Sequence, residues 1–123
     1  MDVVALFLPE IRELIQAKDF NGLKALLKTV HSINIAEGWR HLEPYQKIIV
    51  FKLLGTKKAI EVFENLRLQE QTYVLNNLGS TEVAQIINEM APDDRADLFK
   101  ELPDKVMRKL LALASKEEAR NIE

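Results

Sequence analysis

The sequence predicts an all-α protein, a right-handed superhelical stack (α-solenoid) of short helix hairpins. Two observations predict this fold. First, the chain of 123 residues matches itself without gaps at a period of 24 residues, and such self-similarity is the signature of a repeat architecture. Second, the apolar residues of each period recur at helical spacings, so that they share one face of a helix. The length suits a single domain, and we expect residues 1–123 to form one helical-repeat domain.

The repeat consists of four blocks, at residues 19–42, 43–66, 67–90 and 91–114. In the first half of each block, one apolar column reads Val30, Leu54, Leu78 and Leu102. In the second half, an equivalent column reads Trp39, Phe63, Ile87 and Leu111. Each half has the apolar spacing of an amphipathic helix of about 10 residues. Because such short helices are unstable alone in water, each must pack against its neighbours.

A two-residue turn signal separates the two helices of each block. It reads His31-Ser32, Gly55-Thr56, Gly79-Ser80 and Pro103-Asp104. The second residue of each pair is a favourable N-cap for the following helix. Gly55 and Gly79 suit the left-handed conformation that closes the preceding helix, and His31 could hydrogen-bond the last carbonyls of that helix. Pro44 and Pro92 stand where a first helical turn tolerates proline.

The two ends of the chain differ from the blocks. Residues 4–17 are expected to form a lid helix, with Pro9 near or just before its start. Residues 115–123 repeat the opening of the fourth block, and Ser115 with Glu118 forms a capping-box pattern. We therefore expect a helix there, either cut off from a longer polypeptide or serving as a natural cap.

Composition excludes several classes of function. The chain contains no cysteine, and 17 basic against 19 acidic residues leave no positive excess for binding nucleic acid. The apolar stretch at residues 3–8 is far shorter than the roughly 20 residues of a membrane helix, so no membrane insertion is expected. Phosphate-loop, zinc-protease and nucleophile-elbow motifs are absent, and we expect no enzyme. Trp39 is expected in the core, and His41 on the surface.

Acidic residues gather near the end of the repeat region. Between Glu82 and Asp104, seven acidic residues stand against two basic ones. Asp93, Asp97 and Glu101 are spaced by four residues and so share one helix face, with Asp94 beside them. Such oxygen ligands suit Mg²⁺ or Ca²⁺ better than Zn²⁺. The alternative is structural, because carboxylates also stabilise the first turn of a helix.

The same region carries a family resemblance. The stretch PDDRADLFKELP at residues 92–103, followed by Leu110-Leu111 and Ser115-Lys116-Glu117-Glu118-Ala119, resembles the N-terminal cytosolic domain of MgtE-type magnesium transporters. The resemblance covers roughly residues 10–123 and is strongest over the last two blocks. It implies a superhelical stack of short helix hairpins, in agreement with the repeat found independently.

The resemblance also implies a function. Such a domain would sense cytosolic Mg²⁺, with carboxylates bridged through the ion to the CBS domains of the same polypeptide, and high Mg²⁺ would hold the pore shut. By their place in the motif, Asp93, Asp94, Asp97 and Glu101 would face the CBS domains. The metal site would be weak until the neighbouring domain completes it, and the full-length transporter would be a homodimer. The alternative function is a protein-interaction adaptor, similar to flagellar motor-switch modules.

Overall fold

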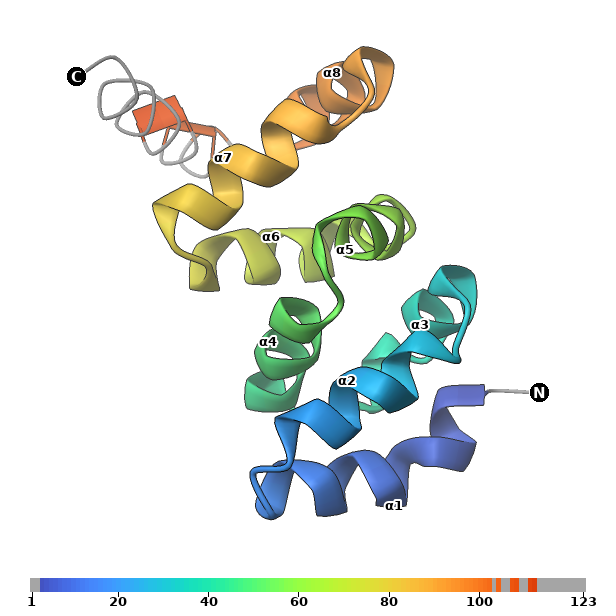
Figure 1. The fold of residues 1–123 in the computed structure, drawn as a ribbon. Coiled ribbons are helices and arrows are strands. Elements are labelled where there is room, and N and C mark those ends of the chain that lie inside the picture. The colour runs from blue at the N-terminus through green and yellow to red at the C-terminus, as the bar shows by residue number, and fades with distance from the viewer. Residues whose placement is uncertain (1–2, 103, 105–106, 109–110, 113–123) are drawn as a thin grey trace. The chain divides into compact units, whose positions relative to one another are not determined.

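The computed structural model describes residues 3–102, 104, 107–108 and 111–112 (Figure 1). Every regular element within these residues is helical, which confirms the all-α fold. The elements are α1 (Val3–Gln16), α2 (Phe20–Lys28), α3 (Ser32–Glu37), the 3₁₀ helix η1 (Trp39–His41), α4 (Pro44–Leu53), α5 (Thr56–Glu64), α6 (Leu68–Asn77), α7 (Ser80–Glu89) and α8 (Pro92–Glu101). Of these helices, none combines the length and apolar character needed to cross a membrane.

The helices fall inside the blocks of the sequence repeat. The first block holds α2, α3 and η1, the second α4 and α5, the third α6 and α7, and the fourth begins with α8. The lid helix predicted at residues 4–17 is α1, within one residue at each end. The helix predicted at residues 115–123 lies outside the described residues.

The chain divides into two compact units, residues 1–66 and 67–123. Unit 1 contains α1 to α5, and unit 2 contains α6 to α8. The division coincides with the boundary between the second and third blocks, so each unit holds whole repeats. A single domain over residues 1–123 stays a prediction.

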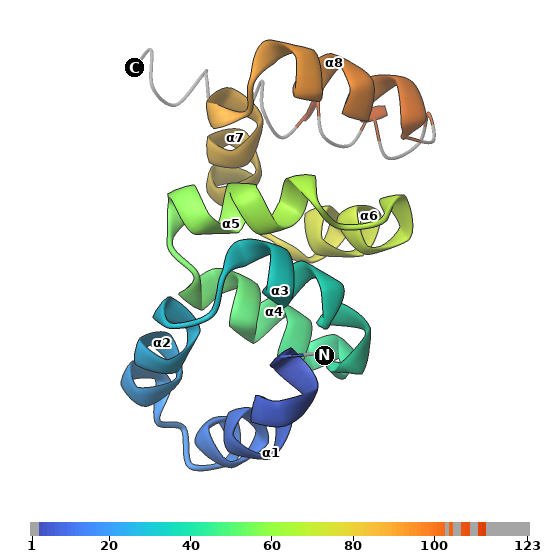
Figure 2. The same ribbon diagram turned by 90° about the vertical axis from the view of Figure 1, so that its right-hand side faces the viewer.

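Unit 1 shows how two repeats stack. Helix α2 packs against α4, and α3 packs against α5, so each helix contacts its equivalent in the next repeat (Figure 2). The lid helix α1 contacts α2, α3 and η1. Stacking of the first two repeats is therefore observed within unit 1. Continuation of the stack across the whole chain, and its right-handed sense, stay predictions.

The predicted apolar columns form the core. Val30, Leu54, Leu78 and Leu102 are all buried. In the second column Trp39 is 1% exposed, whereas Leu111 in the final block is 52% exposed. Phe51 of α4 lies edge-on to both Trp39 and Phe63, with ring centroids 6.4 Å away in each case. Trp39 and Phe63 are one period apart, so this aromatic cluster joins the two repeats of unit 1.

Two side-chain hydrogen bonds also join these repeats, and they correct the predicted roles of His31 and Ser32. The Ser32 hydroxyl donates to the Glu61 carboxylate at 2.7 Å, while His31, not Ser32, occupies the N-cap of α3. The Lys58 ammonium donates to the Leu27 carbonyl near the end of α2, also at 2.7 Å. A cation from the next repeat thus takes the role predicted for His31, because stacking brings it within reach.

The glycine turns also differ from the prediction. Gly55 has φ 81° and ψ 154°, which is a region open to glycine alone but not the left-handed helical one. Gly79 has φ −74° and ψ 166°, an extended conformation that any residue can adopt. Both glycines are N-caps of the following helix, so Thr56 is the first helical residue and not the cap. The fourth pair includes Pro103, which lies outside the described residues.

The prolines divide into two cases. Pro44 and Pro92 begin α4 and α8, as predicted. Pro9 was expected at the edge of the lid helix but lies inside α1, where it cannot donate a helical hydrogen bond. Val4 and Ile11 of α1 are both buried, one on each side of the proline. Burial of this face keeps the helix continuous despite the missing bond.

Gly22 at the start of α2 lies close to a capping side chain. The Asp19 carboxylate accepts a hydrogen bond from the Gly22 backbone N–H at 2.9 Å and so caps the helix. A Cβ atom at Gly22 would stand 2.6 Å from an Asp19 carboxylate oxygen. A side chain at this position would therefore displace the Asp19 carboxylate from its capping position.

We predict different outcomes for alanine at the two turn glycines. Gly55→Ala should lower the free energy of unfolding by about 1–3 kcal/mol, since its backbone conformation is strained for any other residue. Gly79→Ala should change the free energy by less than about 1 kcal/mol, because the lower entropy of the unfolded chain is offset by the poorer N-cap. Urea unfolding followed by far-UV circular dichroism measures both. Equal destabilisation by the two variants would contradict the backbone geometry described here.

Candidate functional site: an exposed acidic helix

Helix α8 carries the predicted acidic residues. Pro92 occupies its first turn, and Asp93 and Asp94 follow in the same turn, where the partial positive charge of a helix N-terminus favours carboxylates. Leu98 and Leu102 are buried, which anchors the opposite face of the helix. The local sequence thus both starts the helix and fixes which face is turned to solvent.

The structure places all four predicted carboxylates on the surface. Each of these residues is exposed: Asp93, Asp94, Asp97 and Glu101. Asp93, Asp97 and Glu101 follow one another at successive helical turns, as the spacing predicted. We call these four residues the acidic face.

Helix α8 carries two basic residues, Arg95 and Lys100, and the side chain of Arg95 is turned away from the acidic face. Its Nη1 atom donates to the Ile87 carbonyl of α7 at 3.4 Å, and the residue is half-buried. A residue two positions from Asp93 and Asp97 lies on a different side of a helix. The guanidinium therefore ties α8 to α7, while Lys100, exposed three residues after Asp97, is the basic residue of α8 on the same side as the acidic face.

The acidic face is a row and not a closed site. Across the part of the chain that the structure describes, no three histidine or acidic side chains converge as ligands for a metal ion. A row of carboxylates along one helix can offer oxygens from one side only. Both the half-site and the assignment of these residues as metal ligands stay predictions.

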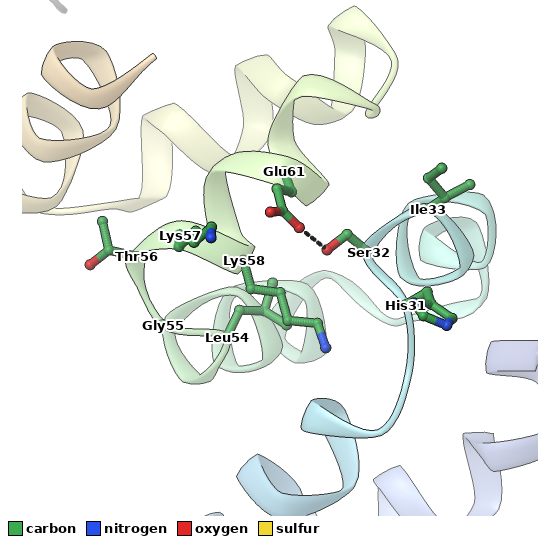
Figure 3. Close-up of a pocket in the computed structure, with 9 residues that line it drawn as sticks. All are labelled: His31, Ser32, Ile33, Leu54, Gly55, Thr56, Lys57, Lys58 and Glu61. Atoms are coloured by element: carbon green, nitrogen blue, oxygen red, sulfur yellow. Dashed lines mark hydrogen bonds between the residues drawn. The ribbon is translucent and has the colours of Figure 1, made fainter. Parts of the chain in front are cut away.

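A second feature, in unit 1, was not predicted from the sequence. An open hollow of about 660 Å³ lies between the α2–α3 and α4–α5 turns (Figure 3). Its lining residues are His31, Ser32, Ile33, Leu54, Gly55, Thr56, Lys57, Lys58 and Glu61. The repeat itself held the signal, because residues 31–33 and 55–57 are one period apart and equivalent turns of stacked repeats are neighbours.

Trp39 and the two histidines do not come together in one site. Trp39 packs in the aromatic cluster, as predicted. His31 is exposed at the start of α3, and His41 is half-buried in η1, although a surface position was expected for it. Its place between the buried Trp39 and Leu42 explains the partial burial.

Comparison with known proteins agrees with the resemblance seen in the sequence. The family described as "MgtE intracellular N domain" matches residues 30–123. A solved structure, described as "Crystal structure of the cytosolic domain of the Mg2+ channel MgtE in complex with ATP", is similar at a TM-score of 0.66 and 27% sequence identity. The similarity covers 85% of this chain and 48% of that one, so the chain spans about half of that structure. No curated protein matches the chain.

The family match includes α8 and the whole second to fourth blocks. The family is intracellular by its description, which agrees with the cytoplasmic location implied by the sequence resemblance. The helical repeat, the exposed acidic helix and the match over most of the length lead to one identification. The chain belongs to the family of MgtE intracellular N domains.

Proposed function

We propose that this chain is the Mg²⁺-responsive regulatory domain of a magnesium transporter. In this proposal the acidic face of α8 binds Mg²⁺ together with adjacent CBS domains of the same polypeptide, and so controls the pore. The observation that carries the proposal is the exposure of Asp93, Asp97 and Glu101 in one row, in a chain of the MgtE N domain family. The proposed role is regulatory and not catalytic, with the domain on the cytosolic side of a homodimeric transporter.

The donor set fits Mg²⁺. This ion prefers oxygen ligands, keeps several of its waters and usually takes only one or two carboxylates from a protein. A single exposed row can supply those carboxylates, and a facing domain can supply the others. The chain alone should therefore bind Mg²⁺ weakly, with a dissociation constant on the order of millimolar.

Charge repulsion explains how binding would be coupled to shape. Without the ion, the carboxylates of the acidic face repel an acidic partner surface across a distance shorter than the Debye length, about 8 Å at physiological ionic strength. An ion that binds the compact arrangement better than the open one shifts the population toward it. The size of the shift is limited by the difference in affinity between the two states.

Helix stabilisation explains only part of the acidic face. Asp93 and Asp94 lie in the first turn of α8, where the helix dipole favours negative charge. Glu101 is the last residue of the same helix, where the dipole disfavours a carboxylate. A row that continues from the favourable end to the unfavourable end supports a role beyond the stability of the helix.

A role in helix stability and a role in binding predict different effects of substitution on the free energy of unfolding. Asp94→Asn should lower the free energy of unfolding by about 0.3–1 kcal/mol, because it removes a charge that the helix N-terminus favours. Glu101→Gln should leave the free energy of unfolding unchanged or raise it slightly, because it removes a charge that the helix C-terminus disfavours. Thermal unfolding at low ionic strength gives both values. A loss of stability in Glu101→Gln as large as that in Asp94→Asn would show that Glu101 has a structural role.

The central test is a Mg²⁺ titration of the full-length protein. Asp93→Asn combined with Asp97→Asn should raise the Mg²⁺ concentration at the midpoint of compaction several-fold, as measured by small-angle scattering or protection from proteolysis. Glu89→Gln is a matched control, because it neutralises an exposed carboxylate on α7 outside the acidic face. An unchanged midpoint in the double variant would refute the assignment of the site.

The gene sequence provides a separate test of the whole proposal. We expect the reading frame to continue beyond codon 123 into CBS repeats and several apolar spans of about 20 residues. A stop codon at that point would instead favour the adaptor function, in which a helical stack binds a partner protein.

A further inference from the structure

The hollow of unit 1 has the size and the position of a binding site. Its volume of about 660 Å³ lies within the range of about 300–1,000 Å³ that is usual for ligand sites. It is open to solvent and lies between turns of two stacked repeats (Figure 3). An open hollow of this kind suits an extended segment that enters and leaves it, more than an enclosed small molecule.

Hydrogen bonds between the repeats hold the walls of the hollow in place. Lys58 is fixed by its bond to the Leu27 carbonyl, and Ser32 is fixed by its bond to Glu61. Figure 3 shows the Ser32–Glu61 bond at the junction of the two walls. A partner would thus meet side chains that are already ordered, which reduces the entropy lost on binding.

The charges in the hollow favour an acidic partner. Lys57 is exposed, and Lys58 is half-buried beside it. The ammonium of Lys58 binds a neutral carbonyl, and the carboxylate of Glu61 accepts its bond from a neutral hydroxyl. The lining therefore contains two ammonium groups and one carboxylate, so it carries a net positive charge. This is the reverse of the charge on the acidic face of α8.

The hollow also offers apolar surface. Ile33 is 59% exposed and so offers aliphatic surface to a partner, and the largely buried Leu54 also lines the hollow. A simple inorganic anion would satisfy the lysines and leave this surface in water. A peptide with acidic and aliphatic side chains in alternation satisfies both.

We propose that this hollow is a docking site for an acidic, leucine-bearing peptide segment of a partner protein. A carboxylate of the segment binds Lys57 and Lys58, and a neighbouring aliphatic side chain packs on Ile33. The site differs from the proposed Mg²⁺ site in its unit, its charge and its ligand. It therefore adds a protein interaction to the proposed regulatory function and does not depend on it.

Fluorescence anisotropy of the whole chain with a labelled peptide, Leu-Glu-Asp-Leu-Glu-Asp, tests the proposal. Lys57→Glu should weaken binding about fivefold or more, because it replaces an attraction by a repulsion. This variant should fold normally, since a carboxylate is favoured in the first turn of α5. Ile33→Ser, measured at the same ionic strength, should also weaken binding, because it removes the aliphatic side chain on which the peptide packs.

Lys24→Glu is the matched control. Lys24 is an exposed lysine on α2 of the same unit that does not line the hollow, so the same charge change should alter affinity less than about twofold. Absence of peptide binding, or equal binding of a Leu-Lys-Arg peptide, would overturn the proposal. A third outcome would also overturn the proposal: inorganic tripolyphosphate displaces the peptide, and Ile33→Ser does not change peptide affinity. That outcome would indicate a site for small anions.

Discussion

The constraint on which the structure depends is the inability of a helix of about ten residues to persist alone in water. Such a helix gains its stability by burying an apolar face against neighbouring helices. In unit 1 this is visible as the contacts of α2 with α4 and of α3 with α5. The aromatic cluster of Trp39, Phe51 and Phe63 contributes to the same packing, because aromatic side chains bury a large area.

This constraint acts on the buried columns and leaves the outer positions free. The residues one, two and three periods before Asp93 are Gln69, Tyr45 and Asn21, and all four residues are exposed. A single outward position thus carries a carboxylate, an amide or an aromatic ring without cost to the fold. Folding of the helices therefore does not require the acidic residues of α8 or the basic residues of the hollow in unit 1. Both groups of residues are for this reason candidates for function.

The sequence was informative wherever burial alone decides the outcome. The 24-residue period, the paired helices of the first three blocks and the core positions of Trp39 and Phe63 follow from apolar spacing, and the structure confirms them. The exposure of the acidic face was predictable for the same reason, since it lies opposite Leu98 and Leu102. Local turn chemistry was less predictable. The conformations of Gly55 and Gly79 differ although both precede a hydroxyl residue, because the chain on either side imposes different paths.

The sequence by itself determined the repeat, the helices and the residues that must be buried, because helical periodicity is a local property of the chain. Only the tertiary structure decided the roles of Ser32 and Lys58, whose partners Glu61 and Leu27 lie 29 and 31 residues away. It also decided that Pro9 lies inside α1 and that equivalent turns enclose a basic hollow. These features depend on which surfaces meet when repeats stack, and no spacing along a single helix contains that information.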